Sequence, residues 1–278
     1  MDLTRALDLL KRESEALDAV VGSLSETDWR RPTPAVGWTV AHQIGHLHWA
    51  DTVAEMAVTG SPEFRKVLDE ASDSLTDDTA AEHAARPQQE LLSDWRRQRG
   101  RLHEALADAD PQKKIPWFGP PMRLLSMVTA RIMETWAHGL DIHDGLSREK
   151  VPSESLEAVA RIGYRTRGFS YANRRLVPPD DDVRVVLTMP DGTQLEYGDP
   201  EAKQSVTGTA DAFCRVVTQR RHPSEVEISA EGQHALEWLS IAQAFAGPPT
   251  EGPRAEIPSA QSRASSTTEN PTLGQVAR

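Results

Sequence analysis

Two separated segments of the chain carry histidine and glutamate in a pattern suited to binding a metal ion. The first segment holds His42, His46 and His48, and the second holds Glu134 and His138. His42 and His46 are four positions apart, as are Glu134 and His138, and residues at that spacing share one face of a helix. Imidazole and carboxylate together suit zinc, iron, nickel or manganese. Three protein ligands would leave coordination positions open for water or substrate.

The surroundings of Glu134 strengthen this interpretation. Its neighbours include Ile132, Met133 and Trp136, so the segment is largely apolar. A carboxylate buried there without a partner is costly, and a cation beside it would remove that cost. The alternative is a solvent-facing pair of Glu134 and His138, which is common on helices at this spacing.

Other histidines of the sequence are not expected to be metal ligands. His42 fits a supporting or surface residue better than a ligand, and His48 points away from the face of His46. The sequence around three more histidines suggests a charged, exposed position or the rim of the site: His83, His103 and His143.

Four long amphipathic segments would have to hold these side chains together. Apolar residues recur at helical spacing from Leu3 to Leu24. A second helix is expected from about Thr39, as N-cap, to Thr59 before Gly60. The other two are expected over 87–109, with Pro87 at the first helical position, and over 123–146. Residues 61–87 suggest a short helix or a mobile loop, and 110–121 a loop. Such helices predict a bundle, where sites form between facing helices.

The series of long amphipathic helices ends at about residue 150. A fifth helix over 153–173 and a break at 178–182 precede a hairpin, whose strands 183–189 and 193–197 flank Pro190-Asp191-Gly192. A helix, a strand and a last helix are expected over 209–219, 226–229 and 234–245. The predicted domains are a helical bundle (1–150), a connecting helix and linker (151–182), a small α+β domain (183–247) and a disordered tail (248–278).

Composition narrows the classes of function. The net charge of −11 argues against a nucleic-acid partner, which needs clustered cations. No apolar run approaches the length of a bilayer span, no signal peptide is visible, and Cys214 is the single cysteine. The prediction is a cytoplasmic protein with no membrane partner and no disulfide, existing as a monomer or a homodimer.

Three motifs resemble one family. Gly37-Trp38-Thr39-Val40 with Gly45-His46-Leu47, and Glu134-Thr135-Trp136-Ala137-His138, resemble motifs of the mycothiol-dependent maleylpyruvate isomerase-like proteins in the DinB-like superfamily. Residues 206–220 resemble the C-terminal motif of the same family, which ends in Trp-Gly-Arg where this chain has Thr218-Gln219-Arg220-Arg221. The stretches Phe118-Gly119-Pro120-Pro121-Met122 and Ala244-Phe245-Ala246-Gly247 are closer to an uncharacterised metal-binding subgroup.

The resemblance implies both a fold and a set of site residues. The fold is a four-helix bundle with the DinB-like up-down-down-up order, followed by a small sterol-carrier-like α+β domain. The metal ligands are His46, Glu134 and His138, and the metal is expected to be zinc. The cofactor is mycothiol or a similar low-molecular-weight thiol, in an actinobacterial setting. Arg220 is assigned the catalytic role, although Arg221 is an alternative, because a guanidinium can bind a substrate carboxylate through two hydrogen bonds.

These residues support a chemical hypothesis with two alternatives. Metal coordination deprotonates a thiol, and the thiolate can add to an electrophilic small molecule, giving isomerisation if it is later expelled or a conjugate if it is kept. The same ion acting on water would instead make a hydrolase. The third class is a protein that binds a metal or a small ligand without catalysis.

Overall fold

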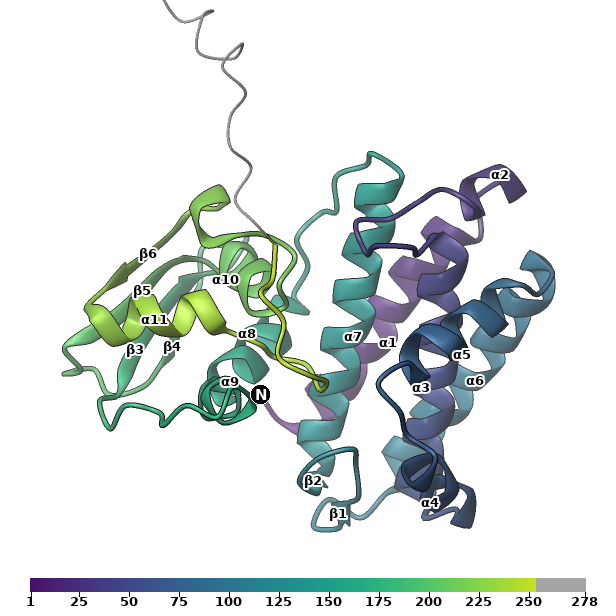
Figure 1. The fold of residues 1–278 in the computed structure, drawn as a ribbon, viewed down its shortest axis with the longest axis horizontal. Helices are drawn as coiled ribbons and strands as arrows, with labels where there is room; N and C mark the ends of the chain where they lie inside the picture. The colour runs from purple at the N-terminus through teal and green to yellow at the C-terminus, as the bar shows by residue number, and fades with distance from the viewer. Residues whose placement is uncertain (254–278) are drawn as a thin grey trace, which may run out of the picture.

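The computed structural model describes residues 1–253 (Figure 1). Residues 254–278 lie outside this range, and with them most of the tail that the sequence analysis assigns to 248–278. Within the described part, a mostly helical N-terminal region is followed by a small mixed sheet with its own helices, as the sequence predicted. None of the helices in residues 1–253 combines the length and the apolar character needed to cross a bilayer.

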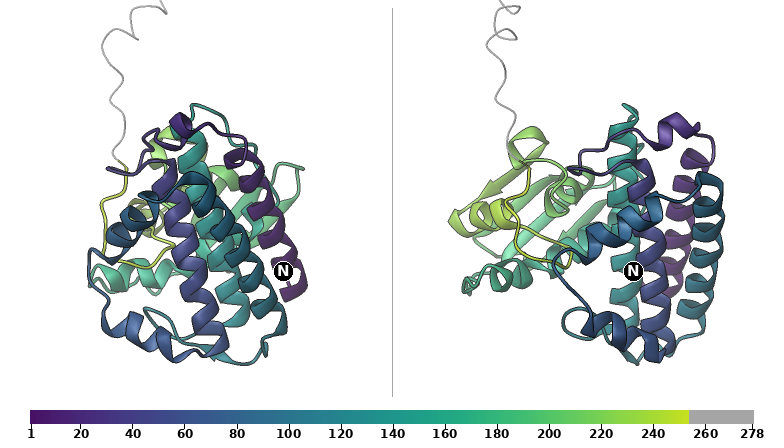
Figure 2. Two further views of the ribbon diagram at one scale, coloured as in Figure 1. Left: turned by 90° about the vertical axis from the view of Figure 1, so that its right-hand side faces the viewer. Right: turned by 45° about the vertical axis from the view of Figure 1, so that its right-hand side comes forward.

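Four long helices make up the N-terminal region and pack side by side (Figure 2). α3 contacts α6 and α7, while α1 contacts α7 and α6, so each helix buries an apolar face against its neighbours. The second of these helices ends at Gly60, which takes the left-handed conformation (φ 78°) that favours glycine. The bounds are α1 Leu3–Val21, α3 Val40–Thr59, α6 Gln88–Asp108 and α7 Leu124–Gly145.

The connections between the long helices contain more regular structure than the sequence indicated. The segment 61–87 holds two helices, α4 (Pro62–Asp69) and α5 (Leu75–Ala84), and a one-turn helix α2 (Glu26–Trp29) follows α1. Pro87 is the N-cap of α6 and not its first helical residue. The expected loop over 110–121 is closed by a short antiparallel ladder of β1 (Lys114–Ile115) and β2 (Met122–Arg123).

The predicted fifth helix over 153–173 is wrong as a single element. The structure has α8 (Leu156–Arg165) and α9 (Arg167–Asn173), separated at Thr166, whose backbone is not helical (φ −89°, ψ 9°). Its hydroxyl donates to the carbonyl of Ile162 at 2.9 Å. Such a bond from a threonine back to the preceding turn often accompanies a bend.

The C-terminal sheet has the strand order β4-β3-β5-β6. β3 (Val183–Thr188) and β4 (Gln194–Tyr197) form the predicted antiparallel hairpin. The sequence analysis missed β5 (Gln204–Thr209), which pairs parallel with β3 and antiparallel with β6 (Ile228–Glu231). The helices that accompany the sheet are α10 (Ala210–Val217) and α11 (Gln233–Ile241), with a 3₁₀ turn over Pro223–Glu225.

The two parts meet at α7, which lies between the sheet-containing part and α3 (Figure 1). α8 packs against both α7 and α10. Ion pairs cross the junction, among them Arg220 with Asp141 and Arg221 with Asp144. The helix that carries Glu134 and His138 is therefore also the contact surface for the C-terminal part.

Candidate metal centre

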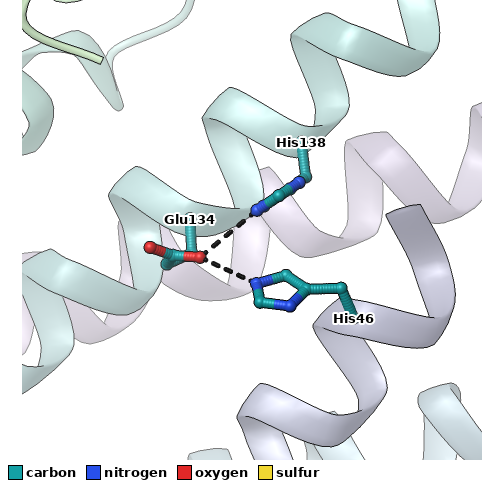
Figure 3. A group of neighbouring side chains, drawn as sticks. All are labelled: His46, Glu134 and His138. Carbon is teal, nitrogen blue, oxygen red and sulfur yellow. Dashed lines mark hydrogen bonds and ion pairs between the residues drawn. The ribbon is translucent and has the colours of Figure 1, made fainter. Parts of the chain in front are cut away.

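Three side chains from α3 and α7 converge at the interface of these helices (Figure 3). His46 Nε2 lies 3.2 Å from Glu134 Oε2, and His138 Nε2 lies 3.3 Å from the same oxygen. The three candidate ligand atoms all lie within 4.8 Å of one another. The sequence analysis named this set, and the structure brings it together; that it binds a metal stays a prediction.

Local sequence explains how the two helices present these groups. Glu134 and His138 are one turn apart on α7, so both side chains point toward α3. On α3, Gly45 precedes His46 because α5 approaches closely there: a Cβ at Gly45 would lie 2.8 Å from the Cβ of His83. The glycine permits tight packing of α5 against α3, the helix that carries His46.

Gln43 determines which ring nitrogen of His138 carries the proton. Its side-chain oxygen lies 2.5 Å from His138 Nδ1, and its amide nitrogen donates to Thr33 Oγ1 at 2.8 Å. An amide oxygen can only accept, so His138 carries its proton on Nδ1 and a lone pair on Nε2. That lone pair faces a carboxylate oxygen of Glu134. Two lone pairs at this distance need a cation or a proton between them, and the donor set of two imidazoles and one carboxylate fits a divalent transition metal.

The pKa values of the site agree with this arrangement. Burial is the main cause that lowers the pKa of His138 to about 4, and His46 lowers it further, against the attraction of Glu134. Burial alone would raise the pKa of Glu134, but the contacts with the imidazoles of His138 and His46 outweigh burial and hold that pKa well below its usual range. At neutral pH the site therefore holds an ionised Glu134 and a neutral His138.

Trp38 covers the imidazole side of the site. Its ring stacks on His138, with centroids 5.9 Å apart and planes 17° apart, and lies 5.5 Å from the ring of His46. The indole nitrogen donates to Asp77 Oδ1 on α5 at 2.8 Å. The tryptophan of the Gly-Trp-Thr-Val motif thus shields both imidazoles from solvent on one side.

Arg220 reaches α7 but binds a protein carboxylate. It donates from Nε and Nη2 to Asp141 at 3.2 and 2.7 Å, and from Nη1 to the carbonyl of Thr218 at 2.7 Å. Asp141 Oδ2 in turn lies 3.9 Å from His138 Nδ1. Gln219 adopts a positive φ of 57°, a conformation that favours glycine, at the position of the glycine in Trp-Gly-Arg. This conformation favours Arg220 over Arg221 as the counterpart of the motif's arginine, and the assignment stays a prediction.

Five other histidines that the sequence analysis considered lie away from the three candidate ligands. His42 accepts from the backbone nitrogen of Thr39 and caps α3, while His48 and His83 contact each other with ring centroids 4.7 Å apart. His103 contacts the carbonyl of Leu7, and His143 that of Glu149. None of these five joins the group of candidate ligands in residues 1–253.

Sequence reasoning missed Gln43 as part of the site. A buried glutamine carries no pattern that identifies its partner, and here the partner lies 95 residues away. Its position three residues before His46, on the same face of the helix, is the one signal that the sequence offered.

Comparison with known proteins places this geometry in a family context. The family model described as the mycothiol maleylpyruvate isomerase N-terminal domain matches residues 10–143, which include all three candidate ligands. An uncharacterized protein from two strains of Mycobacterium tuberculosis is 48% identical over 246 residues, covering 87% of this chain and 96% of its own.

Solved structures show the same fold. The chain resembles the crystal structure of a mycothiol-dependent maleylpyruvate isomerase with a TM-score of 0.57 and 15% identity, and a mutant of that enzyme with 0.59 and 13%. Both comparisons cover 84% of this chain and 96% of the other. At this identity the likeness concerns the fold alone.

Proposed function

Because the chain belongs to the family defined by the mycothiol maleylpyruvate isomerase N-terminal domain, we propose that it is an enzyme that depends on a divalent metal, with zinc as the preferred ion. In this proposal it activates a low-molecular-weight thiol such as mycothiol for addition to an electrophilic small molecule, as an isomerase or a thiol transferase.

One observation carries the proposal. Two imidazole nitrogens converge on a single carboxylate oxygen of Glu134, at 3.2 and 3.3 Å, and Gln43 orients one of them with its lone pair inward. A structural ion pair would supply a permanent cation to the carboxylate. Here the side chains that face it are donors suited to a metal.

The chemistry divides between the ion and the side chains. A bound divalent metal lowers the pKa of a coordinated thiol, which makes the thiolate available at neutral pH. Glu134 and the two histidines would hold the ion, and Gln43 would keep His138 in the ligating tautomer. Trp38 would exclude water from the imidazole side. Glu134 is 21% exposed and is thus the side of the triad open to a substrate.

Arg220 is the proposed anchor for a substrate anion. Its guanidinium now makes a two-bond contact with Asp141, one turn beyond His138. A substrate carboxylate would bind this guanidinium beside Asp141 through charge-assisted hydrogen bonds, while Asp141 keeps its counter-charge. The C-terminal part of the chain would then contribute a binding group to a centre built on the helical part.

The proposal also includes features predicted from the family and from the sequence itself. They are the up-down-down-up order of the bundle, the sterol-carrier-like fold of the C-terminal part, the domain boundaries at 150, 182 and 247, and the absence of a nucleic-acid or membrane partner. A cytoplasmic monomer or homodimer in an actinobacterial cell, where mycothiol is available, fits this picture.

The test begins with metal content. The wild type and a His46→Ala/His138→Ala double variant are purified without added metal and analysed by mass spectrometry for bound metals. We expect about one equivalent of zinc in the wild type and none in the double variant. The loaded protein is then assayed on maleylpyruvate with and without mycothiol. Turnover without thiol would favour a hydrolase, and absence of metal in the wild type even after reconstitution would contradict the proposal.

A further inference from the structure

An aromatic cluster begins directly beside the metal centre and has no part in the function proposed above. The ring of Trp49 lies 6.0 Å from that of His46, and the ring of Phe118 lies 6.2 Å from Trp49. Trp117 and Phe64 complete the cluster, with Phe118 at 5.3 Å from Trp117 and 6.1 Å from Phe64. Centroid distances in this range are those of favourable aromatic pairs.

Three different elements supply these rings. Trp49 is three residues after His46 on α3, Phe64 belongs to α4, and Trp117 and Phe118 come from the connection between β1 and β2. The two-stranded ladder closes that connection and holds it against the helices. This is the Phe-Gly-Pro-Pro-Met segment that the sequence analysis singled out, and its Phe118 contacts Trp49, the ring next to His46.

The burial of the cluster differs from that of a packed core. Phe64 is 4% exposed and forms the base. Trp49, Trp117 and Phe118 are only partly buried, so each retains some solvent-exposed surface although it packs against the core. Apolar surface that is exposed, contiguous and adjacent to polar donors is typical of ligand sites.

The cluster lies at one end of the centre and Arg220 at the other. α3 and α7 run antiparallel here, because His46 faces Glu134 while Asp51 faces Arg131. Trp49 therefore lies toward the N-terminal end of α7. Asp141, with Arg220, lies toward its C-terminal end. The metal centre thus separates an apolar end from a cationic end.

We propose that the aromatic cluster binds an aryl group, or a comparable planar apolar group, of a substrate whose polar head reaches the metal. The proposal rests on the function proposed above and adds a substrate class to it: an aromatic electrophile in preference to a small aliphatic one. Phe118 and Trp49 are the residues that determine this specificity. Stacking between rings supplies affinity and also restricts the substrate to an orientation with its reactive group toward Glu134.

The test compares two metal-binding probes that differ in one group. Benzohydroxamate and acetohydroxamate bind zinc through the same head, and one carries a phenyl ring where the other carries a methyl. Their dissociation constants for the zinc-loaded full-length chain are measured by isothermal titration calorimetry. We expect benzohydroxamate to bind at least about tenfold more tightly, which corresponds to roughly 1.4 kcal/mol.

Variants of Phe118 test whether the aromatic cluster causes the preference for benzohydroxamate. Phe118→Ala should reduce the ratio of the two constants to below about threefold while leaving acetohydroxamate affinity unchanged. Phe118→Leu keeps an apolar side chain for folding and should show the same loss of preference. Tyr164→Ala is the matched control, because Tyr164 is a partly buried ring that stacks on Tyr197 in the C-terminal part.

The outcomes separate this inference from the function on which it rests. Equal affinity of the two hydroxamates in the wild type, or an unchanged ratio in both Phe118 variants, overturns the aryl site while the metal centre stands. Failure of the wild type to bind zinc overturns the proposed function, and the aryl site with it.

Discussion

Two acidic side chains lie in the interface between α3 and α7, and their partners differ. Asp51 is 5% exposed and accepts from Arg131 Nη2 and Nε at 2.9 and 3.2 Å. Glu134 lies nearer the surface and faces His46 and His138. The fold therefore supplies a permanent cation to one carboxylate and only imidazole nitrogens to the other. The first pair is built for stability, and the second group has the composition of a metal site.

The electrostatics of the two acids support this distinction. Burial raises the pKa of Asp51, and Arg131 works against that rise. Arg131 is itself 2% exposed, so each charge depends on the other. Glu134 has a pKa well below its usual range, and within residues 1–253 its ion-pair partners are the imidazoles of His46 and His138, with no guanidinium or ammonium among them. Its charge is compensated when a cation binds.

The largest effect is expected from replacing Arg131, the cation that pairs with Asp51. Arg131→Met leaves Asp51 buried without a counter-charge, and we expect the metal-free protein to lose about 3–5 kcal/mol of unfolding free energy. Urea denaturation measures this loss. An Asp51→Leu/Arg131→Met double variant should recover most of it, since apolar replacement of a buried pair is often neutral. A single variant as stable as the wild type would show that the pair is not structural.

The second prediction concerns Glu134, the acid that faces the two imidazoles. Glu134→Gln should weaken zinc binding by more than about 100-fold, because loss of a mere partner of a ligand already costs about 10–100-fold. Competition with a chromogenic chelator measures the affinity. His48→Ala and His83→Ala remove the second imidazole pair, which has no place in the group of candidate ligands, and should bind zinc normally. Equal zinc affinity in Glu134→Gln and the wild type would remove Glu134 from the site.

Gln43 allows a finer test, because it touches a proposed ligand and not the ion. Gln43→Leu should weaken zinc binding by about 10–100-fold. It should also shift His138 away from the tautomer protonated on Nδ1, which nitrogen-15 NMR detects. Gln43→Glu retains an acceptor and should keep that tautomer. A purely structural role for Gln43 would lower stability without changing the tautomer.

The smallest effect is expected at the edge of the site. Asp77→Ala removes the acceptor of the Trp38 indole, an exposed contact of the kind that contributes about 0–1 kcal/mol. Zinc affinity should change by less than about fivefold. Tryptophan fluorescence, with zinc titration, follows both effects. A loss as large as that expected for Gln43→Leu would make the Trp38 contact a requirement for the centre.

The long helices and the candidate ligands were predictable from the sequence because each leaves a local signal. Helical periodicity defined α1, α3, α6 and α7 to within a few residues. The spacing of Glu134 and His138 suggested a shared face, and the family motifs added His46. The coarse fold followed from the same local patterns.

The elements that the sequence analysis missed depend on distant partners. β5 reads Gln-Ser-Val-Thr-Gly-Thr, which is polar and contains a glycine, and it becomes a strand by pairing with β3 and β6. The contact of Gln43 with His138 likewise joins residues far apart in the chain. Tertiary contacts, and not local propensity, determine each of these.

The separation of the ligands along the chain has a consequence for folding kinetics. His46 and Glu134 are 88 residues apart, and the centre exists only when α3 has docked on α7. Contacts of such long range form late, after the entropy of closing the intervening loop has been overcome. A metal that binds only the assembled centre would stabilise the native state more than the folding transition state. Zinc should therefore slow unfolding while leaving the refolding rate nearly unchanged. The ion would then stabilise the native state kinetically.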